Sequence, residues 1–348
     1  MFKIIKIVIQ YKTIQIIGGE KMSKIIQIEK LYDNYHCMYF GYVGIDLETK
    51  EIKYYSFYNS NQEYNKNSLY EFDPNNIETG SYIGWHMYHC SYKRPSLSDK
   101  LPDELVQLTQ FFINHHKEYN INNNYPIQNI DQNSTNLSIQ YRSNFSLFGD
   151  SGFSAIYVPV ENIIGLTTDK SKWNALSSDE KEDSKNSLIH EIGHMKVSNY
   201  KLDEKNNILF VKTGFYWSEI QLTPIMLENG DIFYKIAKVP EKWQNCNEKA
   251  LEEIINDLDC SLAFSSFKGN YPKLGKRLND LCDKKLTFAR YDIGIEQFYI
   301  SLQKIINSQD LASELLEHIG DSVYGYDPEV SENKALQLIK KYEDKKFR

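Results

Sequence analysis

The chain has 348 residues, a formal net charge of −7 and a charged fraction of 25%. This length allows one large domain or two to three smaller ones, each with an ample core. The acidic balance argues against a nucleic-acid partner, because a phosphate-binding surface needs an excess of lysine and arginine.

Residues 1–21 are apolar and basic, but Lys6 and Lys12 interrupt any signal-peptide core. The segment is also too interrupted for a membrane span, which needs about 20 apolar residues. Residues 18–22 (GGEKM) are what a purine-rich ribosome-binding sequence and a start codon would encode. We therefore expect a bacterial protein that starts at Met22, with 1–21 as a non-native or disordered leader. No targeting signal then remains, so we expect a cytoplasmic protein without membrane association.

Aromatic-rich stretches predict a β-rich N-terminal region over 22–98. Residues 36–58 read as two strands joined by a polar turn, and 80–92 (GSYIGWHMYHCSY) as another strand. Five widely spaced cysteines without a C-x-x-C pair favour buried thiols in a reducing compartment over a disulfide framework. They are Cys37, Cys90, Cys246, Cys260 and Cys282.

An α/β lobe is expected over 99–200. A helix begins near Pro102 and places Leu105, Leu108, Phe111 and Phe112 on one face. His115 and His116 are expected at its end, where cations favour the helix dipole. A polar loop (120–136) and two strands (137–148 and 152–166) follow.

The strongest helix prediction covers 177–198, where Ser177 and Glu180 form a capping box and Leu188, Ile192 and Met195 face the core. Residues 201–247 are expected to form an insertion or hairpin. A helical C-terminal lobe over 248–348 completes an α+β fold. Its predicted helices span 247–265, 273–284, 294–307, 309–319 and 331–344.

The predicted helix over 177–198 carries the motif H-E-x-x-H at His190, Glu191 and His194. Positions i and i+4 share one helix face, so both imidazoles can bind one ion while Glu191 reaches a water beside it. The alternative is a pair of exposed helix histidines among acidic neighbours.

A catalytic zinc site takes three protein ligands, and 251–260 (LEEIINDLDC) can supply the third. Glu253 can bind the metal while Asp257, one turn later, accepts a hydrogen bond from the far nitrogen of His190. Glu252 is the main rival, although its i+4 neighbour, Asn256, orients a histidine less well. A solvated acidic helix face remains the alternative for this segment.

Together the two motifs resemble the gluzincin, or thermolysin-like, zinc metallopeptidases, whose second motif reads E-x-x-x-D. The resemblance covers about 100–265 and implies a zincin-like fold, one zinc ion and a polypeptide substrate lying along an edge strand. Two departures stand out. His194 and Glu253 are 59 residues apart, longer than in thermolysin, and Glu252 replaces the asparagine that precedes the second motif.

The resemblance implies that zinc activates water and that Glu191 transfers its proton to the leaving amine. A further donor normally stabilises the oxyanion. Tyr271, Tyr291, Arg290 and His318 are candidates that the sequence does not rank.

A second metal site is suggested by His86, His89 and Cys90. Residues i and i+3 of the strand expected there point to opposite faces, so shared coordination is disfavoured. The leading function is therefore a zinc metallopeptidase, most simply an endopeptidase. The runner-up is a zincin-fold binding or regulatory protein whose metal is structural or vestigial, and a metal-free interaction protein comes third. Oligomeric state, cleavage specificity and the role of 22–98 are not determined by the sequence.

Overall fold

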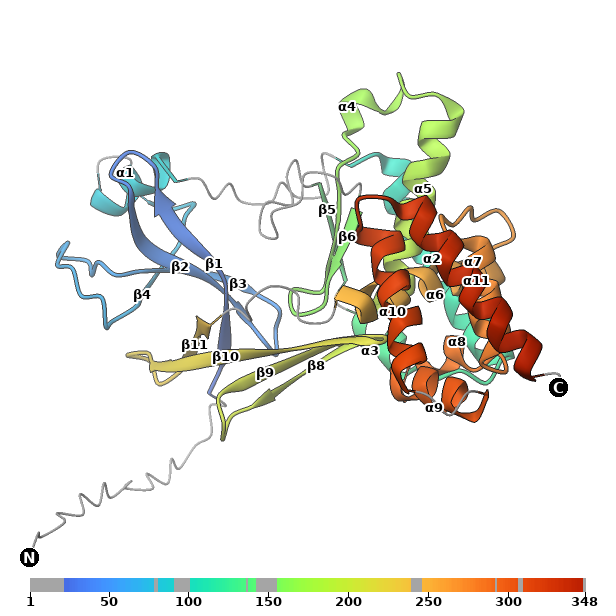
Figure 1. Cartoon of the computed structure of the whole chain (residues 1–348). Coiled ribbons are helices and arrows are strands. Elements are labelled where there is room, and N and C mark those ends of the chain that lie inside the picture. Colours follow the sequence, from blue (N-terminus) through green and yellow to red (C-terminus); the bar gives the residue numbers. More distant parts are fainter. Residues whose placement is uncertain are drawn as a thin grey trace, which may run out of the picture.

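The computed structural model describes residues 22–77, 81–90, 101–135, 137–141, 155–238, 246–291, 293–305 and 309–346, and it has an α+β fold. A large sheet lies on one side, a helical region on the other, and a small sheet between them (Figure 1). The proposed leader, 1–21, falls outside the described residues.

The large sheet combines strands from two distant parts of the chain. Its eight strands run in the order β4-β3-β2-β1-β11-β10-β9-β8, and only β1 and β11 among its neighbours pair in parallel. Figure 1 shows the blue and yellow strands side by side. The strands are β1 (Lys24–Asp33), β2 (Met38–Asp46), β3 (Ile52–Ser56), β4 (Tyr70–Phe72), β8 (Ser198–Asp203), β9 (Ile208–Thr213), β10 (Tyr216–Met226) and β11 (Ile232–Lys238). The stretch expected as an insertion therefore completes the N-terminal sheet.

The small sheet has the order β5-β7-β6, which places β6 at an edge among the described strands. Its strands are β5 (Ser138–Tyr141), β6 (Ala155–Val158) and β7 (Ile163–Leu166). The predicted strand over 152–166 is thus two antiparallel strands, because the chain turns at Asn162, which has φ 54°. Asparagine tolerates this left-handed conformation better than most residues.

Two further sequence predictions, for 80–92 and for 120–136, are wrong. The stretch 80–92 contains a helix, α1 (Tyr82–Tyr88), because the Ser81 side chain accepts the Gly84 N–H and starts a helical turn. The expected polar loop contains the end of α2 (Asp103–Asn122) and all of α3 (Gln128–Thr135). Because α2 continues to Asn122, His115 and His116 do not lie at its end. Phe111, which was expected on the apolar face of this helix, is exposed.

The helical region contains the five predicted helices and the short α8. They are α6 (Cys246–Ala263), α7 (Pro272–Leu281), α8 (Leu286–Ala289), α9 (Glu296–Ile305), α10 (Gln309–Tyr324) and α11 (Pro328–Lys346). Helix α6 joins two cores: Leu251 and Ile254 pack among the C-terminal helices, whereas Cys260 packs with α2 and α5 (Ser178–Met195).

All five cysteines lie in described residues and none forms a disulfide. Cys37 and Cys246 are exposed, which corrects the expectation that all five are buried. No described helix combines the length and apolar character that crossing a bilayer requires.

Candidate metal centre

Helix α5 carries the H-E-x-x-H residues, and a capping box fixes where this helix begins. Ser177 and Glu180 form the predicted capping box, which satisfies N–H groups that the first turn leaves unpaired. Leu188, Ile192 and Met195 are fully buried, as predicted, and fix which face of α5 meets the core. The helix ends at Met195, close to the predicted end.

Helix α6 packs closely against α5 at Gly193. A Cβ on Gly193 would lie 2.3 Å from Asn256 Oδ1 and 2.7 Å from Cys260 Sγ, so only glycine fits here. The Asn256 side-chain amide also donates to the His190 carbonyl at 2.9 Å. These contacts set the distance between the two helices that carry the candidate ligands.

Three ligand atoms converge where α5 and α6 meet. His190 Nε2 lies 2.9 Å from Glu253 Oε2 and 3.0 Å from His194 Nε2, and His194 Nε2 lies 3.3 Å from the same oxygen. The structure thus groups the three predicted ligands, His190, His194 and Glu253, as a set that could hold a metal ion. Their side chains are 17%, 9% and 24% exposed, so the group is reachable from solvent.

Each histidine uses its other nitrogen to contact a carboxylate. His190 Nδ1 lies 2.9 Å from Asp257 Oδ1, the pairing predicted from sequence, and His194 Nδ1 lies 3.2 Å from Glu252 Oε1. Glu252, the rival in the sequence prediction, therefore lies against the far nitrogen of His194 and is not one of the three grouped residues. Carboxylates in this position fix the tautomer and the direction of a metal-binding imidazole.

This donor set fits a divalent cation. When each Nδ1 carries the proton, both Nε2 lone pairs face the Glu253 oxygen. Three hydrogen-bond acceptors then lie close together with no proton between them, and they repel one another. Burial lowers the pKa of His194, but Glu253 and Glu252 outweigh it and raise that pKa to about 9. The cluster thus favours positive charge, which a metal dication supplies without protonating the nitrogens. Two imidazoles and one carboxylate are ligands typical of zinc.

Glu191 lies beside this group and is buried. Its Oε2 accepts the backbone N–H of Tyr157, on edge strand β6, at 2.7 Å. Burial raises the pKa of the Glu191 carboxyl, although His190 and His194 oppose the rise. Glu191 is thus a buried carboxylate with a raised pKa beside the candidate ligands and strand β6.

A buried charge network supports Glu252 from behind. Arg290, fully buried, donates to Glu252 at 2.5 Å and to Asp259 at 2.7 Å. Lys196, also fully buried, pairs with Asp259 at 2.7 Å and contacts His116 Nδ1 at 3.2 Å. Burial, and then the ammonium of Lys196, hold the pKa of His116 well below its usual value.

Two carboxylates thus balance two cations in this network. Sequence reasoning missed this network, since only three-dimensional contact reveals it.

The turn between β9 and β10 contacts the Glu252 carboxylate, and Figure 1 shows these strands extending to the helical side. Phe215 N–H donates to Glu252 Oε2 at 3.2 Å. Gly214 has φ 55°, and a Cβ there would collide with the same side chain. The segment predicted as an insertion therefore helps to hold Glu252, which in turn contacts His194.

The predicted oxyanion donors separate into two groups. Arg290 is occupied by the buried network, the Tyr291 hydroxyl donates to Asn120 at 2.9 Å, and His318 lies 4.0 Å from Glu314. Tyr271 begins α7, and its backbone N–H donates to Asp257 at 3.3 Å. Burial raises its pKa and that of Tyr324, and the Glu253 charge raises both further. Tyr324, which the sequence did not suggest, thus shares with Tyr271 the electrostatic influence of Glu253.

No protein-family model, curated protein or solved structure matches this chain.

Proposed function

We propose that the chain is a zinc-dependent metallopeptidase that hydrolyses peptide bonds, with Glu191 as the general base. One observation carries the proposal: both Nε2 atoms and Glu253 Oε2 converge while both Nδ1 atoms contact carboxylates. Partial exposure of the ligands supports a catalytic site over a closed structural one. The combination resembles the gluzincin arrangement.

A zincin-like architecture belongs to the same proposal. It consists of edge strand β6, helix α5 with two ligands and helix α6 with the third. In it, the substrate backbone lies along β6 and brings the scissile carbonyl to the ligand group. The Tyr157 N–H holds one oxygen of Glu191, which leaves Oε1 to act on water.

Zinc, when bound by His190, His194 and Glu253, supplies Lewis acidity that acidifies water and polarises the carbonyl. Glu191 takes a proton from the attacking water and delivers it to the leaving amine nitrogen. Asp257 and Glu252 keep the proton of each imidazole on Nδ1, so the Nε2 lone pairs stay available.

Zinc content and cleavage of a quenched peptide library test the proposal. Glu191→Gln keeps zinc and lowers the cleavage rate by about 10²–10⁴-fold, because only the base is lost. His194→Ala loses cleavage and the zinc ion held by this group. Asp183→Asn, an exposed carboxylate on the same helix, is the matched control and keeps both. Full cleavage by Glu191→Gln would refute the assigned role.

The second candidate is a binding or regulatory protein without peptidase activity. The bond between Glu191 and the Tyr157 N–H favours it, since that bond occupies part of the proposed base. A wild-type chain that binds zinc tightly but cleaves no library peptide would select this second function.

A further inference from the structure

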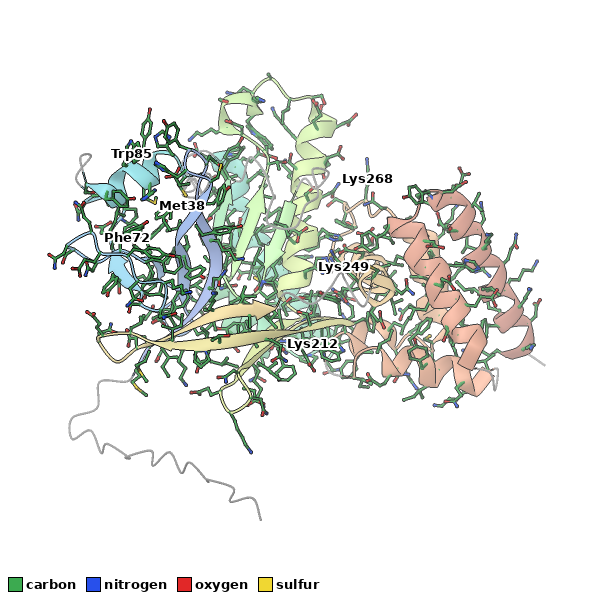
Figure 2. All side chains as sticks on the ribbon, turned by 60° about the vertical axis from the view of Figure 1, so that its left-hand side comes forward. Met38, Phe72, Trp85, Lys212, Lys249 and Lys268 are labelled. Carbon is green, nitrogen blue, oxygen red and sulfur yellow. The ribbon has the colours of Figure 1, made fainter. Side chains whose placement is uncertain are left out.

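A second cluster of metal-ligating side chains lies at the outer end of the large sheet. It consists of Asp33 at the end of β1, His36 in the following turn and His86 on α1. Figure 2 marks the region by Trp85 and Met38, on the side away from the C-terminal helices. The cluster shares no residue with the candidate metal centre.

One carboxylate oxygen is the focus of this cluster. Asp33 Oδ2 lies 2.7 Å from His36 Nδ1 and 2.5 Å from His86 Nδ1. Its partner, Oδ1, accepts the backbone N–H groups of Tyr35 and His36 at 2.8 and 3.1 Å. The backbone therefore holds the carboxylate in one orientation and leaves Oδ2 for the two imidazoles.

Asp33 is buried but charged. Burial raises the pKa of its carboxyl, but hydrogen bonds from His36, His86 and the backbone outweigh this and hold the pKa well below its usual value. The fold also fixes α1 against the turn, because Asn34 N–H donates to the His89 carbonyl at 3.1 Å. Side chains from two chain segments, residues 33–36 and helix α1, are thus positioned before any ion binds.

His86 supplies the observation that points to a cation. Its ring is fully buried and stacks between Phe40 and Tyr58, with the Tyr82 ring perpendicular at 4.6 Å. Its Nε2 is buried and has no hydrogen-bond partner among the described residues. When Nδ1 donates to Asp33, a neutral ring leaves a bare lone pair at Nε2, which is unfavourable in an apolar environment.

A cation on Nδ1 removes this conflict. The single proton of the neutral ring then sits on Nε2, and an N–H surrounded by aromatic rings is tolerated through weak N–H···π contacts. His36 is 31% exposed, so its side of the cluster is open to a water ligand. Tetrahedral zinc holds its ligand atoms roughly 3.3 Å apart, and the exposed His36 ring can move outward to reach that spacing.

We propose that Asp33, His36 and His86 bind a second divalent transition-metal ion, zinc by preference, which fastens α1 to the turn between β1 and β2. Two imidazole nitrogens and one carboxylate oxygen suit zinc and related first-row ions rather than calcium or magnesium. The proposal is independent of the proposed peptidase function.

Metal stoichiometry of the full-length, chelator-stripped chain tests this proposal. We expect two equivalents of Zn²⁺ by calorimetry and two Co²⁺ sites by visible absorption in the wild type. His36→Ala retains one, His194→Ala retains the other, and the double variant retains neither. His89→Ala is the matched control: its ring contacts Tyr35 and Trp85 on the same surface but is not one of the grouped ligands, so it keeps two.

Two further measurements separate ligand loss from misfolding. Asp33→Asn keeps an acceptor for the backbone N–H groups and should lower affinity at this site by at least 10²-fold with an unchanged circular dichroism spectrum. Zn²⁺ should raise the melting temperature of His194→Ala but not of the His36→Ala/His194→Ala double variant.

If His194→Ala abolishes all binding while His36→Ala and Asp33→Asn change nothing, the cluster is only a buried ion pair. That result overturns the second site and leaves the first intact. A wild type that binds no Zn²⁺ or Co²⁺ overturns both.

Discussion

Replacing Arg290 with methionine tests the buried network behind His194. The guanidinium makes contacts of 2.5 Å to Glu252, 2.7 Å to Asp259 and 2.7 Å to Asn256, all away from water. Its removal leaves two buried carboxylates against one remaining cation, Lys196. Breaking a buried pair in this way costs about 3–5 kcal/mol, so we expect a loss of that size in the free energy of unfolding.

Urea unfolding of the metal-free chain measures this loss without a contribution from metal binding. Arg277→Met is the matched control: its pair with Glu343 is about one-third exposed and contributes roughly 0–1 kcal/mol. Adding Glu252→Gln to Arg290→Met removes one unpaired charge and should restore roughly 1–3 kcal/mol. A loss below about 1 kcal/mol for Arg290→Met would show that the network does not carry the predicted energy.

Three further predictions concern the same region. Gly193→Ala puts a Cβ 2.3 Å from Asn256 Oδ1, so α5 and α6 must separate. We expect the free energy of unfolding to fall by about 1–3 kcal/mol and zinc binding to weaken, and an unchanged zinc affinity would contradict this. Asp257→Asn should weaken zinc binding about 10–100-fold by calorimetry, because His190 loses its orienting carboxylate. The pKa of His116 is lower in the folded chain than in the unfolded chain, so below about pH 6.5 the unfolded chain binds a proton that the folded chain does not. The free energy of unfolding should therefore decrease as the pH falls below that value, by up to about 1.4 kcal/mol per pH unit. His116→Gln should flatten that slope in urea unfolding between pH 7 and 5.

The alignment of the candidate ligands along each helix was predictable, because it depends on one short-range periodicity. His190 and His194 are four residues apart on one helix, as are Glu253 and Asp257 on another, and this spacing aligns side chains on any α-helix. The choice of Glu253 over Glu252 followed from the same spacing. The spacing alone does not bring the two helices together; that part of the prediction rested on the resemblance to the gluzincin motifs, and the close packing at Gly193 supplies it here.

The large sheet was not predictable in the same way. Strand β1 pairs with β11, with Ile25 opposite Phe233, and nothing local in either stretch specifies the other. The helix α1 was missed for a different reason. Its aromatic residues have strand propensity, whereas the side chain of Ser81 decides in favour of a helix. The sequence considered His86 only with its neighbours His89 and Cys90, whereas the structure groups it with Asp33 and His36 from a distant turn.

The charge of Glu252 explains why Arg290 must be buried. An asparagine at this position could support a histidine without a counter-charge, whereas a glutamate brings a negative charge into a site that is only 1% exposed. Burial raises its pKa, and Arg290 is the largest opposing influence that keeps the pKa below its usual value. Asp259 and Lys196 then complete a neutral set. Glu252, where the proposed gluzincin motif has an asparagine, is thus tied to Arg290, which lies far along the sequence. Glu252→Asn together with Arg290→Met should therefore keep zinc binding, whereas either change alone should weaken it.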